Sequence, residues 1–314
     1  MWSPIRQDYW PFKPPGGSLE YLPCIVNKRV AFANSYAHGQ PLLRASSHSE
    51  QEVRRALEEN LWSLWSHFGR GDGCVLHEEP VATWFDTPIP TLPYNAVIRF
   101  AAQRDVDRLV KALFAHYQRR GVPFLWIVHP TATPADLVER LRRRGFEEAE
   151  ACPGMYSVIA DLPEAQEPPP GIVICEVGVE TDSNALLELV GWRWAVPPEA
   201  LAKLPQVTRA FAVGAPGSAV RSWLALREGV PVAKVLLHLA AGVAGVYGVV
   251  TRPEARGLGL ARTLTLRAFG AARREGYEIG VLHSTPMARP MYEKIGFRPR
   301  SAFRIFAPPR ALHL

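Results

Sequence analysis

The stretch VVTRPEARGLGLA, residues 249–261, predicts a strand that ends near Val250, then a tight turn, then a helix that begins in the glycines. The first N–H groups of such a helix have no partners within it, and the aligned peptide dipoles make that end partly positive. Gly257 and Gly259 have no Cβ, so a ligand can approach the backbone closely. Arg256 adds a charge and a forked donor. The stretch therefore predicts a phosphate- or pyrophosphate-binding site.

The same stretch resembles a motif of the GNAT superfamily of N-acetyltransferases. Arg256-x-x-Gly259-x-Ala261 is similar to the family's Gln/Arg-x-x-Gly-x-Gly/Ala element, and a Val-x-x-Pro segment at 250–253 precedes it. Further along, MYEKIGF at 291–297 resembles the family's later Leu-Tyr-x-x-x-Gly-Phe element. Taken alone, the first motif is also compatible with an ordinary strand–turn–helix whose glycines serve packing. The order and spacing of the elements favour the family.

The resemblance implies an α/β fold with a mixed (α+β) sheet and a site for acetyl-CoA as the cofactor. The thioester tail of coenzyme A would lie where the strand ending at Val250 and the strand ending at Ser284 splay apart. Ser284 stands where relatives often have an asparagine that holds pantetheine. The other cofactor contacts that the resemblance implies are Gly248, Val249 and Val250 for the pantetheine, and Arg256, Gly257, Leu258, Gly259, Leu260 and Ala261 for the pyrophosphate.

The implied chemistry is transfer of an acetyl group to an amine, which attacks the thioester directly once it is neutral. Tyr292 is the candidate general acid for the departing thiolate, since a phenol is protonated at neutral pH. The alternative is that Tyr292 only packs the short helix that carries it. Many relatives have a glutamate on the fourth strand as general base, but residues 243–250 contain no carboxylate.

The general base therefore stays open among several groups. His238, His283, Glu228, a water chain or no base at all are compatible with the sequence. His283 alternates across its strand with Ser284, so only one of the two faces the cofactor. A lone strand histidine is more often a core residue than a base.

The two halves of the chain repeat one pattern. Gly121 precedes a strand, a helix, Gly145-Phe146 and a strand, and Gly276 precedes the same order around Gly296-Phe297. This predicts an internal duplication, that is, two tandem GNAT-like acyl-CoA N-acyltransferase units. The expected domains are an N-terminal extension (1–45), a degenerate GNAT-like domain (46–163), a proline-rich linker (164–170) and the GNAT N-acetyltransferase domain (171–314).

The first half lacks the signals of a cofactor site. The counterpart of the phosphate loop, residues 100–107, has no glycine, and Asp105 and Asp107 would repel a pyrophosphate. No tyrosine precedes Gly145. We expect this half to bind no coenzyme A and to wall the substrate cleft or stabilise the second domain. The first regular element of this half should be an amphipathic helix that begins near Ser47, with Ser47 and Glu50 as its capping box.

Composition and charge limit which kinds of partner the protein is expected to bind. The chain has 314 residues, a net charge of +6 and four scattered cysteines without metal-ligand spacing, which indicates reduced thiols and no metal. The arginines at 140–144 are expected on a solvated helix face, so no nucleic acid is expected as a partner. No apolar run is long enough to span a bilayer, and a cytoplasmic location and no membrane partner are the expectation.

The acceptor class is the least determined feature. A small-molecule amine is favoured over a protein, and Trp192, Arg193 and Trp194 lie either in its pocket or in the core. The protein is expected to be a monomer or a homodimer. The alternatives are a non-catalytic acyl-CoA-binding protein and a transferase that uses another acyl donor, such as a longer acyl-CoA or an aminoacyl group.

Overall fold

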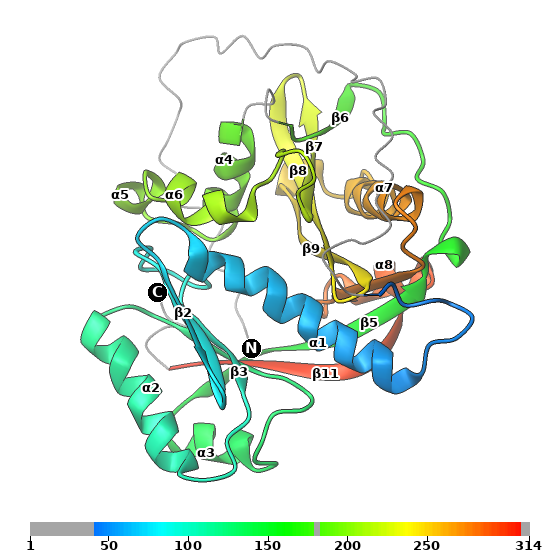
Figure 1. The fold of residues 1–314 in the computed structure, drawn as a ribbon. Helices are drawn as coiled ribbons and strands as arrows, with labels where there is room; N and C mark the ends of the chain where they lie inside the picture. The colour runs from blue at the N-terminus through cyan, green and yellow to red at the C-terminus, as the bar shows by residue number, and fades with distance from the viewer. Residues whose placement is uncertain (1–40, 179–182, 309–314) are drawn as a thin grey trace.

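The computed structural model describes residues 41–178 and 183–308, in which one continuous sheet has 11 strands. Their order across the sheet is β1-β2-β3-β4-β11-β5-β10-β9-β8-β7-β6, which runs through both halves of the chain (Figure 1). The strands are β1 (Val75–Glu79), β2 (Ala82–Asp86), β3 (Ala96–Phe100), β4 (Leu125–Val128), β5 (Glu147–Val158), β6 (Ile172–Glu176), β7 (Val220–Arg227), β8 (Val230–Ala240), β9 (Val243–Thr251), β10 (Ile279–His283) and β11 (Arg298–Ala307).

The two halves exchange their last strands. β5, which ends the first half, pairs antiparallel with β10 of the second half, from Ile279↔Val158 to His283↔Gly154. In return β11, the last strand described, pairs antiparallel with β4 of the first half, and it also pairs with β5. The mixed α/β fold and the tandem layout are thus as expected. The proposed domain boundaries stay a proposal, because the halves share one sheet.

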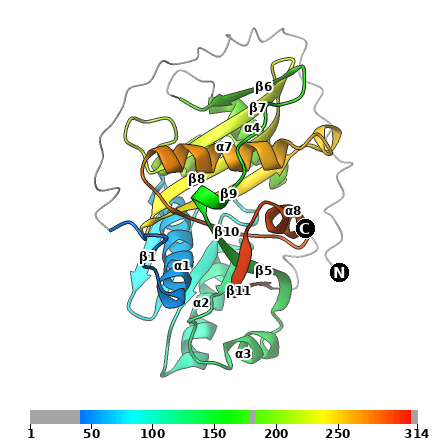
Figure 2. The ribbon, with the colours of Figure 1, turned by 90° about the vertical axis from the view of Figure 1, so that its right-hand side faces the viewer.

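Helices cover both faces of this sheet. They are α1 (Glu50–Ser66), α2 (Val106–Arg120), α3 (Leu137–Arg143), α4 (Ser183–Arg193), α5 (Pro198–Leu201), α6 (Leu204–Thr208), α7 (Leu260–Arg274) and α8 (Arg289–Lys294). Single 3₁₀ turns, η1 to η4, lie at His67–Arg70, Ile159–Asp161, Arg209–Phe211 and Pro253–Ala255. Figure 2 shows α7 lying across β7, β8 and β9. No described helix has the length and apolarity needed to cross a membrane.

Alternation along β9 and β10 assigns α1 and α7 to opposite faces. Val243 and Val281 pack with Val53 and Leu57 of α1. Their neighbours Ala244, Val246 and Leu282 instead share a core cluster with Leu260 and Leu264 of α7. Successive side chains of a strand point to opposite faces, so the two helices cover different sides of the same strands. The sides are called the α1 face and the α7 face below.

Helix α1 belongs to the first half by sequence but docks on the second. Asn60 is fully buried and donates to the carbonyl of Ala240 at 2.8 Å, while Tyr247 donates its hydroxyl to Asn60 Oδ1 at 2.8 Å. The helix starts two residues later than expected. Ser49 and Glu52 form the capping box, not Ser47 and Glu50, because Ser49 has the extended backbone that an N-cap requires.

The remaining sequence expectations for helices agree with the structure. Helix α2 ends at Gly121, whose φ of 65° is the left-handed C-cap predicted for a glycine. The arginines of α3 lie mainly on its exposed side, and Arg140 and Arg144 pair with Asp107. Of the N-terminal extension, residues 1–40 lie outside the described part, whereas Leu43 donates to the carbonyl of Gly242 at 2.9 Å.

Candidate active site

The two parallel strands β9 and β10 separate near their carboxyl ends. They pair over three positions, of which the last joins Leu282 to Val246, whereas β9 continues to Thr251. On its other side β9 stays paired with β8, with a bulge opposite the step from Lys234 to Leu236. Gly248 in this bulge has a φ of 53°, which favours glycine. The edge of β9 that faces β10 is therefore open over residues 247–251, as predicted from the sequence.

The loop after β9 presents unpaired amides at the start of α7. Gly257 and Gly259 both have positive φ, 78° and 74°, and a Cβ added to either would meet nothing within 4 Å. Gly259 is the N-cap and makes no side-chain cap bond. The N–H of Arg256 donates to the Pro253 carbonyl at 3.1 Å, so the amides that are free to bind an anion are those of residues 257–261 rather than 256–261.

The free N–H groups of that loop suit a pyrophosphate. Within residues 41–178 and 183–308, no backbone group accepts a hydrogen bond from the amides of Gly257, Leu258, Gly259, Leu260 or Ala261. Five neighbouring donors at the positive end of a 15-residue helix form a site for an anion. The exposed side chain of Arg256 stands beside them.

Ser284 and Tyr292 follow β10 and lie by the α7 side of the sheet. Ser284 is fully buried; its amide donates to the Pro153 carbonyl at 3.1 Å and its hydroxyl donates to the Thr285 carbonyl at 2.9 Å. That hydroxyl can therefore only accept a hydrogen bond from a ligand. Tyr292 is 5% exposed and packs in the core cluster of α7. Burial raises its pKa to about 12, although the nearby Thr265 hydroxyl opposes the shift.

None of the three side chains that the sequence offered as general base is in a position that suits proton removal from an amine. The His283 ring is buried against Phe303, with centroids 4.3 Å apart, and burial lowers its pKa to about 3. His238 is buried, and its Nε2 lies 3.1 Å from the hydroxyl of Ser63 on α1. Glu228 is in the turn between β7 and β8, where the hairpin ends. The alternating positions of His283 and Ser284 hold: the histidine faces α1.

Lys234 is a functional candidate that the sequence reading missed. It is 5% exposed, and its ammonium donates to the carbonyl of Gly248 at 2.8 Å. Burial, together with the positive charge of Arg193, lowers its pKa to about 8. A Cβ on Gly248 would lie 2.9 Å from this ammonium, so the glycine makes room for it. The sequence did contain a signal for this buried charge, namely a lysine within a run of apolar strand residues.

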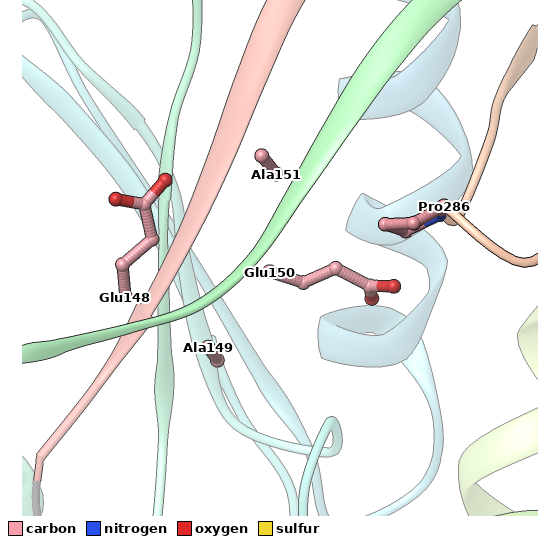
Figure 3. Close-up of a pocket in the computed structure, with 5 residues that line it drawn as sticks. All are labelled: Glu148, Ala149, Glu150, Ala151 and Pro286. Carbon is pink, nitrogen blue, oxygen red and sulfur yellow. The ribbon is translucent and has the colours of Figure 1, made fainter. Parts of the chain in front are cut away.

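A second missed group lies on the exchanged strand. Glu150 belongs to the first half, yet it lines a hollow of about 430 Å³ together with Glu148, Ala149, Ala151 and Pro286. Figure 3 shows the Glu150 carboxylate directed toward Pro286, while Glu148 turns to the other side. Burial raises the pKa of Glu150, against the opposing effects of the Cys152 thiol and the Arg193 guanidinium.

Arg193 connects these groups. It is the last residue of α4, its guanidinium lies 4.4 Å from the Trp194 ring, and it interacts electrostatically with Glu150, Lys234 and Arg256. Burial lowers its pKa, and the positive charge of Arg256 adds to this, whereas Glu150 opposes it. Arg193 thus lies between the phosphate loop and the exchanged strand. Trp194, by contrast, packs against a core cluster with Val196 and Leu204, so the pocket interpretation of this segment stays a prediction.

The corresponding gap in the first half is filled by protein. Strands β3 and β4 also pair only briefly, at Ala96↔Leu125 and Val97↔Trp126. Beyond them the buried His129 contacts Phe100 with its Nε2, 3.2 Å from both the N–H and the carbonyl. Glu58 of α1 lies 3.2 Å from the other ring nitrogen. The backbone edge that pantetheine would use is therefore taken by an imidazole.

Among residues 41–178 and 183–308, one group of side chains could hold a metal ion, and it was not predicted from the sequence. Ligand atoms of His77, Asp86 and His116 lie within 4.8 Å of one another. Both histidines reach the Asp86 carboxylate at 2.9 Å, and Arg120 lies 3.6 Å from it. The carboxylate is buried and already has three positive or hydrogen-bonding neighbours. This cluster is explained as a network that satisfies Asp86, and it lies in the first half.

The comparisons with known proteins agree with this geometry. Residues 186–297 match the model of the acetyltransferase (GNAT) family. The chain is similar in structure to a GCN5-related N-acetyltransferase from Kribbella flavida (TM-score 0.59, 18% identity, 82% of this chain and 95% of that one). It is also similar to one from Sphaerobacter thermophilus (TM-score 0.55, 19% identity, 72% and 75%).

The tandem layout has a solved counterpart as well. A tandem GNAT protein from the clavulanic acid biosynthesis pathway aligns with a TM-score of 0.51, 13% identity and coverage of 85% of this chain and 97% of that one. At these identities the structural likenesses show the fold. No curated protein matches the chain significantly. Over residues 186–297 the chain therefore carries a domain that matches the GNAT acetyltransferase family, which supports an acyltransferase.

Proposed function

We propose that the protein transfers an acetyl group from acetyl-CoA to the amine of a small molecule, by direct attack of the neutral amine on the thioester. The observation that carries this proposal is the open edge of β9 leading to five unpaired amides, Gly257 to Ala261. The edge suits the amides of a pantetheine chain, and the loop suits a pyrophosphate. The two features are contiguous in the chain and lie at the same end of the sheet.

The chain's own residues supply the rest of the site in this proposal. Gly248, Val249 and Val250 offer the strand edge, and Ser284 accepts a hydrogen bond from the pantetheine. Tyr292 keeps its proton at every physiological pH, because burial raises the pKa of the phenol to about 12. A thiol has a pKa near ~8.5, so full proton transfer from such a phenol is uphill. Tyr292 therefore stabilises the departing sulfur mainly by donating a hydrogen bond.

A cytoplasmic site of action and a monomeric or homodimeric state belong to the same proposal, as does the acetyl rather than a longer acyl donor. A role as a non-catalytic acyl-CoA-binding protein is the second candidate, and the absence of a carboxylate from β9 favours it. Thioester cleavage separates the two candidates. Only an enzyme makes the amine-dependent release of thiol from acetyl-CoA faster than it is in the same mixture without protein.

The test uses the full-length protein in two measurements. Calorimetry with coenzyme A measures whether the site binds the cofactor at all. Thiol release from acetyl-CoA, in the presence of amino acids, polyamines and amino sugars, measures transfer. Binding with amine-dependent thiol release supports the enzyme. Binding without thiol release supports the second candidate, and no binding contradicts both.

A further inference from the structure

Strand exchange brings a carboxylate of the first half to the cofactor gap of the second. The register of β5 on β10 ends with Gly154 opposite His283, the last residue of β10. The next N–H along the chain, that of Ser284, still donates to Pro153 at 3.1 Å. Residues 147–152 of β5 therefore continue past the end of β10, at the place where β9 and β10 have already separated.

Alternation along β5 directs Glu150 to the α1 face. A Cβ on Gly154 would lie 3.4 Å from Leu57 of α1 and 3.0 Å from Phe303. Because side chains alternate along a strand, Cys152 and Glu150 share the face of Gly154. Lys234 lies on this face too: Leu236, two residues further along β8, packs with Leu64 of α1.

This face is opposite to the one that Tyr292 uses. Tyr292 packs with α7, so the cofactor gap has a phenol on one side and a carboxylate on the other. An acceptor amine attacks the planar thioester from one of its two faces, and the α1 side is the one that Tyr292 leaves free. Glu150 lies on the α1 side, in the hollow that Pro286 also lines, and Arg193 is close enough to interact electrostatically with it.

The environment of Glu150 separates it from the other acid of the hollow. Glu148 is paired with Arg142 and Arg304, and these arginines hold its pKa below the usual range against burial. Glu150 has no ion pair at salt-bridge distance within the described ranges. Burial raises its pKa, which the thiol of Cys152 and the charge of Arg193 only partly offset. A carboxylate with a raised pKa is a better proton acceptor at neutral pH.

We propose that Glu150, brought to this site on the exchanged strand β5, is the general base that removes a proton from the acceptor ammonium. The inference rests on the proposed transfer to an amine. The carboxylate takes one proton from R–NH₃⁺, directly or through one water, and leaves R–NH₂. The nitrogen then forms a bond to the thioester carbon, the C–S bond breaks with its electron pair on sulfur, and the second N–H proton restores the thiol. The products are the amide, the free thiol and a protonated Glu150.

This assignment explains why the second half contains no carboxylate on β9. The base comes from the other half of the same chain, so the halves form one active site rather than an active and an inert unit. The first half would then do more than wall the cleft. Its last strand completes the catalytic centre, while its own cofactor gap is closed by His129.

The experiment compares wild type with Glu150→Gln, Glu150→Asp, Lys234→Met and the control Glu147→Gln. Glu147 is exposed at the first position of the same strand. Acetyl-CoA is the donor, and the acceptors are those amino acids, polyamines or amino sugars with which the wild type releases thiol. kcat/KM is measured from about pH 6 to about pH 10, and the Kd for coenzyme A is measured by calorimetry at neutral pH.

We expect the substitution of Glu150 to lower the rate of the proton-transfer step without weakening the binding of coenzyme A. Glu150→Gln should lower kcat/KM by about 10²-fold or more at neutral pH with an unchanged Kd for coenzyme A. The deficit should shrink toward about pH 10, where a primary amine loses its proton to solvent. Glu150→Asp should recover part of the rate, and Glu147→Gln should match the wild type.

Three results would overturn the role of Glu150. One is wild-type kcat/KM in Glu150→Gln at neutral pH. Another is a deficit of the same factor at every pH, which would indicate a structural contribution. The last is a pH-dependent deficit that appears in Lys234→Met instead. Failure of the wild type to release thiol with any amine would contradict the proposed function itself, which keeps the two failures distinct.

Discussion

Replacing Gly259 by alanine tests the phosphate loop against a closely matched control. Gly259 has a φ of 74° and open space around its missing Cβ; Gly121, at the end of α2, has a φ of 65° and equally open space. Both substitutions place an L-residue in the left-handed region, which costs about 1–2 kcal/mol, offset by ~0.4–1 kcal/mol from the unfolded chain. The two variants should therefore lose nearly equal, small amounts of stability.

Only Gly259→Ala should lose affinity for coenzyme A. The new methyl group would stand among the free amides of residues 257–261 and hold a phosphate away from them. One lost hydrogen bond to a charged group is worth about 1.5–3 kcal/mol, which corresponds to about a 10- to 100-fold rise in Kd. Calorimetry with coenzyme A and thermal unfolding of both variants provide the two readouts.

The reasoning is refuted by either of two patterns. If Gly259→Ala binds coenzyme A as tightly as the wild type, the amides at the start of α7 do not hold the pyrophosphate. If Gly121→Ala weakens binding as much, the loss comes from general strain rather than from the loop. The first pattern would also remove the main support for the proposed function.

Three further outcomes are expected. Tyr292→Phe should lower kcat by about 10²-fold, because it removes one hydrogen-bond donor to the departing sulfur, with little change in the Kd for coenzyme A; an unchanged kcat would limit Tyr292 to packing. Gly245→Ala would put a Cβ 2.0 Å from Asn60 Oδ1, so thermal unfolding should show a loss of ~1–3 kcal/mol, or ~2–4 °C per kcal/mol at this size; an unchanged Tm would mean that α1 is not docked as described. Glu58, despite burial, has its pKa lowered by hydrogen bonds from His129 and Thr131. Its stabilisation is present above the unfolded carboxyl pKa and is lost as pH falls through the folded value, so the unfolding free energy of Glu58→Gln should depend less on pH below about 4.5.

The phosphate loop could be predicted because its chemistry is local. A strand end, two glycines and a helix start lie within the 13 residues 249–261, and the torsions of Gly257 and Gly259 follow from that short sequence. The same holds for the C-cap at Gly121, since only the neighbouring turn decides it. The capping box of α1 was placed two residues early, because Ser47 and Ser49 offer similar side chains and the local backbone chooses between them.

The catalytic surroundings were decided by pairings between residues far apart in the chain. Nothing local to Glu150 shows that β5 pairs with β10 rather than with a strand of its own half, and nothing local to Asn60 shows that α1 docks on β8 and β9. The burial of Lys234 and the position of Arg193 depend on those same contacts.

The sequence by itself determined the family motif, the two repeated halves and a backbone ready to hold an anion, because each depends on residues that are neighbours in the chain. Only the tertiary structure decided which half completes which site. Strand exchange is a long-range choice of hydrogen-bond partners, and a strand that could pair with either of two edges has no short-range signal for the one it takes.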